Sequence, residues 1–235
     1  MSFLKAEWRK LVLFNYVVEP EVLVPHLPFG TELDLWEGKC YLSVVGFLFQ
    51  NTKLLGVKIP FHSSFEEVNL RFYVKRIVNG ETRRGVVFIK EIVPKWALSF
   101  VANTIYKEHY VTKPMKYNWT SKNDVLRVEY QWKLPSGWQQ ITVRAKDKLV
   151  PIPEGSEAEF ITEHYWGYAK VSAKKTNEYE VTHPRWSQYP VLGATTDFDF
   201  KLNYGAEFTF LNDVEPTSVL LAEGSEITVE SKRRL

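Results

Sequence analysis

Four polar side chains alternate along one stretch of the sequence, and their types suit the binding or activation of a small organic molecule. They are Glu67, Asn69, Arg71 and Tyr73. A carboxyl group can act as an acid or a base, and a guanidinium group can hold a carboxylate through two parallel hydrogen bonds. Alternation is the spacing that places side chains on one face of a β-strand. The sequence therefore predicts a polar strand face.

A turn signal indicates which residues of the next strand share this face. Asn79-Gly80 is a strong hairpin signal, because a type I′ turn needs positive φ at both positions. It predicts paired strands from Phe65 to Val78 and from Glu81 to Val93. With a two-residue turn, the residues opposite Tyr73, Arg71, Asn69 and Glu67 are, in that order, Val86, Phe88, Lys90 and Ile92.

This predicted face mixes charged and apolar side chains, which limits where it can lie. A solvent-exposed strand rarely carries Val86, Phe88 and Ile92 in a row, and a dry core rarely holds unpaired charges. A partly polar cavity satisfies both conditions. We therefore predict a ligand pocket bounded by Glu67, Asn69, Arg71, Tyr73, Phe88 and Lys90. A structural network of buried ion pairs and a solvated face are the two alternatives.

Two functions are compatible with such a pocket. In the first, the pocket binds a small carboxylate or carbonyl compound, and Arg71 orients the ligand. In the second, an enzyme acts on a carbonyl or keto-acid substrate, with Lys90 or Lys113 as the amine and Glu67 as the acid or base. A lysine that forms a Schiff base must be neutral near pH 7, and Glu67 diagonal to Lys90 would keep it charged. We therefore favour binding over catalysis.

Other kinds of site have no support in the sequence. It lacks the GxSxG, GxGxxG and GxxxxGK[ST] signatures, its five histidines show no metal-binding spacing, and Cys40 is the only cysteine. We expect no metal ion and no cofactor. A formal net charge of +2 is too balanced for a nucleic-acid surface. The longest strongly apolar run, Tyr41 to Phe49, is shorter than the ~20 residues of a membrane-spanning helix.

The same features predict the cellular context. The first ten residues carry charges and no apolar run of the kind found in signal peptides. We expect a cytoplasmic protein whose partner is a small molecule, with no nucleic-acid or membrane partner. The sequence does not define an oligomeric state.

Strand signals dominate the elements that must position the pocket. Aromatic residues, which favour strands, make up 15% of the chain. Further hairpins are predicted around residues 37–38, 135–137 and 223–224, further strands over 164–173, 178–182 and 194–202, and helices over 20–25, 94–106 and 156–160. We predict one domain over residues 1–235, mainly β with a few helices, whose large antiparallel sheet closes into a barrel or cone.

The hairpin around residues 135–137 also alternates polar and apolar residues. Arg127, Glu129 and Gln131 alternate with Val128 and Tyr130 on its first strand. We interpret the polar positions as an outer, solvent-facing surface. The alternative is that they form the other wall of the pocket.

Several ordered motifs resemble those of the YqjF-like uncharacterised proteins (DUF2071). They are the opening from Phe14-Asn15-Tyr16 to Asp34, the acid-x-Asn-x-Arg-x-Tyr-Val run from Glu67 to Val74, and Gly85-Val86-Val87-Phe88 before a predicted helix. That family is similar in fold to acetoacetate decarboxylase, which implies an antiparallel β-barrel or cone with a central cavity. The decarboxylase forms a Schiff base on a lysine beside a second cation. Its lysine pair is not matched, and Lys113 is the nearest candidate, so the resemblance implies the fold more strongly than the chemistry.

Overall fold

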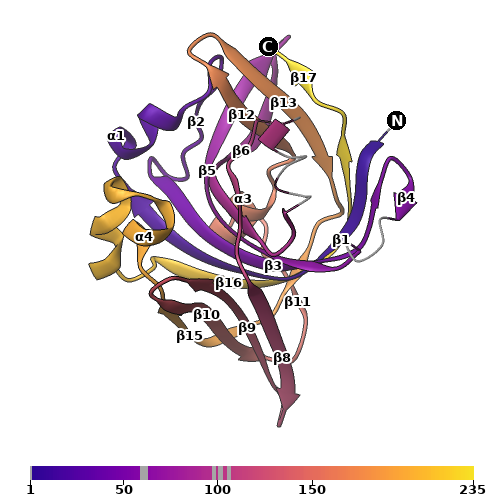
Figure 1. Ribbon diagram of the computed structural model, residues 1–235, viewed down its shortest axis with the longest axis vertical. Helices are drawn as coiled ribbons and strands as arrows, with labels where there is room; N and C mark the ends of the chain where they lie inside the picture. The colour runs from indigo at the N-terminus through magenta and orange to yellow at the C-terminus, as the bar shows by residue number, and fades with distance from the viewer. Residues whose placement is uncertain (1, 59–62, 97–98, 100–102, 105–106) are drawn as a thin grey trace.

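Seven strands form a ring of hydrogen-bonded neighbours in the computed structural model (Figure 1). The structure describes residues 2–58, 63–96, 99, 103–104 and 107–235. In ring order the strands are β16 (Ser218–Glu230), β1 (Ser2–Val18), β3 (Cys40–Leu54), β5 (Phe65–Val78), β6 (Glu81–Val93), β12 (Trp166–Ser172) and β13 (Lys175–Thr182). Neighbours are antiparallel except β6 and β12. The ring closes where Val181 and Thr182 of β13 pair with β16. This confirms the predicted mainly β fold with a large sheet curved into a barrel.

Two joins of the ring are short. The β6–β12 and β13–β16 pairings each rest on two residue pairs. The barrel is therefore closed more loosely on the β12–β13 side than along β1, β3 and β5, whose long strands pair over most of their length.

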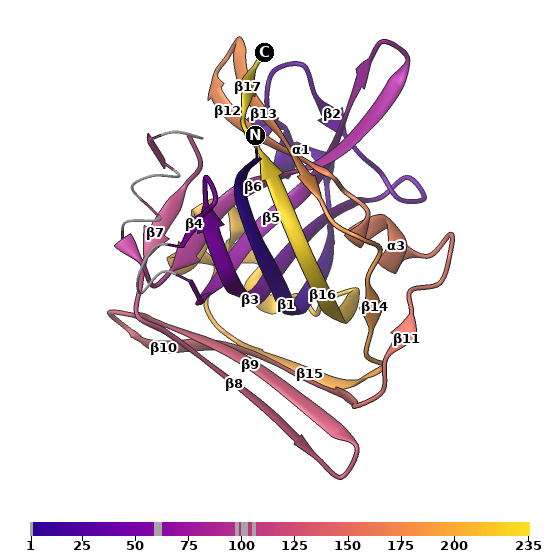
Figure 2. The same ribbon diagram turned by 90° about the vertical axis from the view of Figure 1, so that its right-hand side faces the viewer.

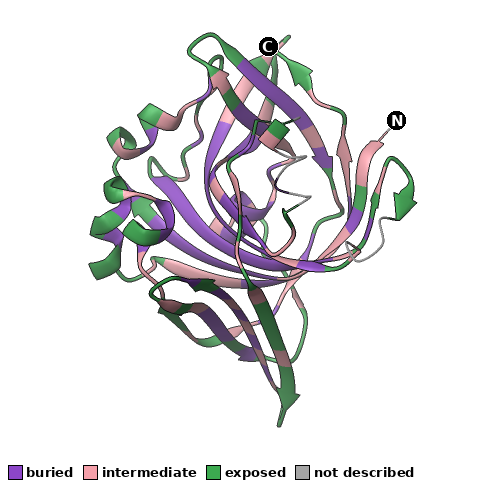
Figure 3. Cartoon of the chain, in the orientation of Figure 1, coloured by how far each residue is buried: buried purple, intermediate pink, exposed green. Residues whose placement is uncertain are grey.

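A second, four-stranded sheet packs against the outside of the ring (Figure 2). It contains β15 (Val191–Asp197), β10 (Gly137–Lys146), β9 (Val125–Leu134) and β8 (Met115–Lys122). Its buried side chains, including Tyr130 and Trp132, share one hydrophobic core with Leu70 and Phe72 of β5. Figure 3 shows this buried layer between the two sheets. This core therefore lies outside the ring, while a second hydrophobic core on the inner face, which includes Leu11, Phe47 and Phe65, borders the space left for a site.

The polar positions of β9 lie on the outer face of the second sheet. Arg127 forms an ion pair with Glu129, and Gln131 donates a hydrogen bond of 2.8 Å to Gln140. All four side chains are partly exposed. This agrees with the interpretation of a solvent-facing surface, and they form no wall of a pocket with β5.

Short elements connect the strands. They are α1 (Pro20–Leu23), η1 (Val24–His26), β2 (Glu32–Leu33), β4 (Val57–Lys58), β7 (Tyr110–Thr112), β11 (Val150–Pro151), α3 (Glu157–Thr162), β14 (Ser187–Gln188), α4 (Phe200–Tyr204), η2 (Ala206–Asp213) and β17 (Arg233–Arg234). None of the helices in the described part of the chain is both long and apolar enough to cross a membrane.

Helix signals were reliable where a first-turn proline or a capping hydroxyl starts the helix. Pro20 begins α1, and the Ser156 hydroxyl accepts a hydrogen bond of 3.2 Å from the Glu159 backbone N–H at the start of α3. The helix predicted over 94–106 falls mostly outside the described residues. The strand predicted over 194–202 is wrong beyond Asp197, because Asp199 caps α4 by accepting from the Leu202 N–H at 2.9 Å.

Hairpin signals gave mixed results. Asn79 and Gly80 both have positive φ, and β5 and β6 have the predicted bounds, so this hairpin is confirmed. The hairpin predicted at Glu223-Gly224 is wrong, because β16 runs through it as one strand. Gly224 lies opposite Arg9, where a Cβ would come within 2.0 Å of the Trp8 carbonyl oxygen. This glycine therefore permits close approach of two backbones and does not mark a turn.

The turn at residues 37–38 is present and β3 follows it, but the segment before the turn does not form the hairpin pairing with β3 that was predicted. Trp36 bridges to Lys39 across the turn, whereas Glu32 and Leu33 pair with β5. The segment before the turn therefore joins the sheet at a different strand.

Candidate functional site

A β-bulge divides the face predicted for β5 and β6. From Val78–Glu81 to Arg71–Phe88 the pairing is the predicted one. Beyond Arg71 the register shifts by one residue, so that Leu70 pairs with Lys90 and Asn69 with Glu91. An extra residue in one strand reverses the side that every later residue faces. The prediction that Lys90 shares the face of Glu67 and Arg71 is therefore wrong, and Glu91 takes the place of Lys90.

Lys90 lies with Lys113 in a different pocket, of about 330 Å³, beside the second sheet. Its amine donates a hydrogen bond to the carbonyl oxygen of Asn203. Burial and the charge of Lys113 lower the pKa of Lys90, so the expectation that Glu67 keeps it charged is also wrong. The inner face of the ring encloses a separate cavity, described below. Every lysine of the chain lies in the described residues, and none of them lines that inner cavity.

Schiff-base chemistry on Lys90 is not expected. Its amine is held by a backbone carbonyl and lies away from the inner cavity. Treatment with acetoacetate and borohydride, followed by mass spectrometry of the digested protein, should find no adduct on Lys90. A stoichiometric adduct there would contradict this placement.

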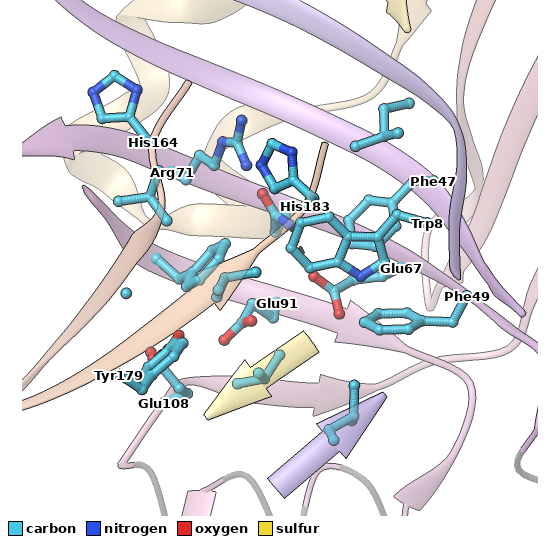
Figure 4. A pocket seen from close by; sticks show the side chains of 18 of the residues that line it. Trp8, Phe47, Phe49, Glu67, Arg71, Glu91, Glu108, His164, Tyr179 and His183 are labelled. Carbon is cyan, nitrogen blue, oxygen red and sulfur yellow. Dashed lines mark hydrogen bonds between the residues drawn. The ribbon is translucent and has the colours of Figure 1, made fainter. Parts of the chain in front are cut away.

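The inner face of the ring encloses a cavity of about 200 Å³ (Figure 4). Its polar lining includes Glu67, Asn69, Arg71, Glu91, Glu108, Tyr110, His164 and Tyr179. Its apolar lining includes Trp8, Phe47, Phe49, Phe65, Val86, Phe88, Val181 and Trp186. Of the six residues predicted to bind a ligand, Glu67, Asn69, Arg71 and Phe88 line this cavity.

Tyr73 supports the cavity without lining it. It is buried, and its hydroxyl forms a hydrogen bond of 2.8 Å with the Ser43 hydroxyl. Its ring centroid lies 4.8 Å from that of His164, which does line the cavity. Tyr73 therefore positions the wall.

Three buried carboxyl groups converge in the cavity from different strands and loops. Glu67 accepts hydrogen bonds from Asn69 at 2.9 Å and from the Tyr110 hydroxyl at 3.3 Å. Glu108 accepts from the Tyr179 hydroxyl at 2.8 Å, and Glu91 Oε2 has no hydrogen-bond partner among the described residues. Figure 4 shows Glu91 beside Glu108 and Tyr179.

Burial shifts the protonation of all three carboxyls in the same direction. Loss of solvation raises the pKa of Glu67 and of Glu108 to about 7. It raises the pKa of Glu91 well above its usual value, and the charges of Glu108 and Glu67 raise it further. Burial of a carboxylate without a cation favours the neutral acid. Burial therefore favours the neutral acid form of Glu91, which can donate a hydrogen bond into the cavity.

Arg71 is the cation of the cavity wall. It is 7% exposed, and its charge lowers the pKa of Glu67, yet it makes no ion pair within 4.0 Å with any described residue. Its Nη2 donates at 3.4 Å to the Ile161 carbonyl, and its Nε has no partner in the described part of the chain. A buried guanidinium with free donors is costly unless a ligand or water satisfies them.

His164 was not predicted as a site residue. Its Nε2 lies 3.2 Å from Asp34 Oδ2, which also accepts a 2.6 Å hydrogen bond from Arg84. Burial lowers the pKa of His164 to about 4, so the ring is neutral near pH 7. Its Nδ1 has no hydrogen-bond partner among the described residues. With Asp34 as acceptor, Nε2 carries the proton and Nδ1 is left as a free acceptor.

No group of three or more metal-ligating side chains occurs among the described residues.

A family model matches most of the chain. DUF2071, described as an uncharacterized conserved protein, matches residues 5–226. The chain belongs to this family. No curated protein matches the sequence significantly.

Solved structures place this DUF2071 protein in the acetoacetate decarboxylase-like fold. An acetoacetate decarboxylase from Legionella pneumophila is similar with a TM-score of 0.65 and 13% identity, over 99% of this chain and 86% of that one. The enduracididine biosynthesis enzyme MppR in complex with pyruvate is similar with a TM-score of 0.66 and 13% identity, over 100% and 91%. An acetoacetate decarboxylase-like enzyme from Sphingomonas wittichii has a TM-score of 0.64 and 11% identity, over 100% and 94%. At these identities the likeness establishes the fold.

Proposed function

We propose that this DUF2071 protein binds a small organic acid in the inner cavity and that Arg71 holds its carboxylate. The observation that carries the proposal is the buried guanidinium of Arg71, which lines the cavity with a free Nε donor and no ion pair to a described residue. A carboxylate would accept two parallel hydrogen bonds from it and balance its charge. One fold relative has been solved with pyruvate, a small acid, which supports this class of ligand.

The neutral carboxyls favour an acid that carries a second oxygen. Burial favours the protonated form of Glu91, which lies across the strand pair from Asn69, two residues along β5 from Arg71. A carboxylic acid O–H donates to a carbonyl or hydroxyl oxygen. A ligand with an oxo or hydroxyl group beside its carboxylate would satisfy Arg71 and Glu91 together.

The buried, unpaired Cys40 is typical of a protein in a reducing compartment, and we propose a cytoplasmic location.

A second candidate function is conversion of the bound acid. The pKa of Glu67 and of Glu108 is about 7, which is the range that suits proton transfer near neutral pH. Because no lysine lines the cavity, such an enzyme would use carboxyl acids and bases in place of a lysine Schiff base.

Thermal unfolding with a panel of small acids tests the proposal. Pyruvate, acetoacetate and related acids should raise the melting temperature, because a ligand at 100 times its dissociation constant stabilises the folded state by about 2.7 kcal/mol. The matching amides and methyl esters should have no effect, since they keep the shape and lose the charge. Equal shifts with acids and amides, or no shift with any acid, would contradict a carboxylate site at Arg71.

A further inference from the structure

We infer that the bound acid carries an aromatic ring, which occupies the end of the cavity away from Arg71. This inference rests on the proposed function, since it assigns the rest of the ligand whose carboxylate Arg71 would hold. The basis is a change in wall chemistry along the cavity: hydrogen-bonding groups lie around the Arg71 end, together with Phe88 opposite Arg71, and aromatic rings enclose the other end. Figure 4 shows Trp8, Phe47 and Phe49 on the opposite side of the cavity from Arg71 and His164.

The strand register shows where along the cavity the wall changes from polar to aromatic. Along the inner face of β5 the sequence runs from Arg71 through Asn69 and Glu67 to Phe65. The nearest aromatic residue of this wall on the neighbouring strand is Phe47, which pairs with Glu67 about 13 Å along β5 from Arg71 at ~3.3 Å per residue, and both side chains line the cavity between these levels. The neighbouring strands follow the same order, since Phe65 pairs with Phe49 of β3 and Phe49 pairs with Trp8 of β1. Three adjacent strands therefore place an aromatic residue at the same level.

The rings at this level form a continuous wall. Phe65 stacks on Phe49 with centroids 4.6 Å apart, and Phe49 lies 5.2 Å from Phe47. Trp8 meets Phe47 edge to face at 5.3 Å and Trp186 at 6.3 Å. Rings in such arrangements offer faces and edges that suit a further aromatic ring at the same separations.

The size of the cavity fits a ring plus a short acid. Its volume is about 200 Å³. An engineered apolar cavity of ~150 Å³ binds benzene, so the remaining space accommodates a carboxylate and one or two further carbons. A three-carbon acid such as pyruvate would leave the aromatic end unfilled. Contact of that end with an aryl group removes apolar surface from water on both sides.

Val181 offers a way to fill space next to the aromatic end. It lines the cavity, is 8% exposed and packs in a cluster with Tyr179, Trp8 and Val229. Val181→Phe would place a ring in the space that the ligand's aryl group needs. Val181→Leu adds less volume and provides a second test if Val181→Phe overpacks the site and fails to fold. Val57→Phe is the control, because Val57 is 65% exposed on β4.

Titration calorimetry of the full chain with pyruvate and phenylpyruvate tests the inference. The wild type should bind phenylpyruvate roughly 10- to 100-fold more tightly than pyruvate, with a more negative heat-capacity change. Val181→Phe should weaken phenylpyruvate binding by about tenfold or more, and by a larger factor than it weakens pyruvate binding, with Val181→Leu intermediate. Val57→Phe should match the wild type for both acids. Melting curves of each variant without ligand confirm folding.

Two negative results separate the inference from the function on which it rests. If pyruvate and phenylpyruvate bind equally well, and the Val181 variants alter neither, the aryl assignment is wrong while the acid site stands. If neither acid binds the wild type, and the wider panel of acids also fails to bind, the acid site itself is wrong.

Discussion

Replacement of Arg71 by methionine is expected to abolish binding of small acids while the protein stays folded. The guanidinium is the cation of the cavity wall, and its removal should weaken binding by at least about 30-fold, since truncating one partner of a buried charge pair costs 2–5 kcal/mol. Methionine keeps most of the side-chain bulk. No described carboxylate lies within ion-pair distance of Arg71, so its loss strands no partner. The melting temperature without ligand should change little.

Three control variants test whether a loss of acid binding is specific to Arg71. Arg83→Met removes an arginine whose Nη1 lies 2.9 Å from the buried Glu178, so it should lower stability without altering acid binding. Arg127→Met removes a charge from the second sheet and should alter neither property. Lys90→Met should also leave acid binding unchanged, because Lys90 lies in the other pocket.

The opposite outcome has a clear structural meaning. A loss of ~3–5 kcal/mol of stability in Arg71→Met, together with no acid that shifts the wild-type melt, would place Arg71 in a structural ion network. It would overturn the acid site and restore the alternative that the polar cluster only supports the fold.

The sequence predicted the part of the site that local rules determine. The Asn79-Gly80 turn and the alternation from Glu67 to Arg71 both act within one hairpin, and each has a direct conformational cause. These rules placed Glu67, Asn69 and Arg71 on one face and Leu70 on the other, as found. The outer face of the β9–β10 hairpin was interpreted correctly for the same reason.

One extra residue in β6 accounts for the main error in the predicted site, the placement of Lys90. The bulge beside Arg71 carries no glycine, proline or turn residue that would mark it directly. It turns Lys90 outward and Glu91 inward. A signal did exist, because Glu91 would otherwise be a lone carboxyl on an apolar core face, and burying a charge there is costly. A bulge would have removed that conflict.

The remaining site residues depend on how the ring closes. Glu108 and Tyr179 meet across the cavity although they are 71 positions apart, and His164 reaches Asp34 across 130 positions. Hairpin rules concern neighbouring strands and carry no information about contacts between residues so far apart in the sequence. The β6–β12 and β13–β16 joins that bring these residues together involve few residue pairs, which leaves little pattern in the sequence.

Replacement of Glu108 by glutamine is expected to stabilise the protein at pH 8 but not at pH 4.5. In the folded protein burial raises the pKa of Glu108 to about 7, from a usual value of 4.5. The folded state therefore binds more protons than the unfolded state between these pH values, and stability falls as the pH rises through this window. A shift of 2.5 units corresponds to about 3 kcal/mol at pH 8. Glutamine does not titrate and can still accept the hydrogen bond from Tyr179.

The difference between two pH values isolates this effect from any change in packing. The free energy of unfolding of Glu108→Gln, relative to wild type, should be up to about 3 kcal/mol more favourable at pH 8 than at pH 4.5. Glu154→Gln is the control, because its side chain is 89% exposed and should show no such difference. A variant equally destabilised at both pH values would mean that Glu108 is a stabilised carboxylate in the folded protein.

The same titration should govern the acid site. Above pH 7 the carboxylates of Glu67 and Glu108 would share the cavity with the anionic ligand, and like charges in a buried site repel strongly. Acid affinity in the wild type should therefore fall as the pH rises from 6 to 8. Glu108→Gln removes one of the two charges and should flatten this profile, whereas Glu154→Gln should retain it. An affinity that rises with pH would instead indicate a cationic ligand, because ionised carboxyls would attract it.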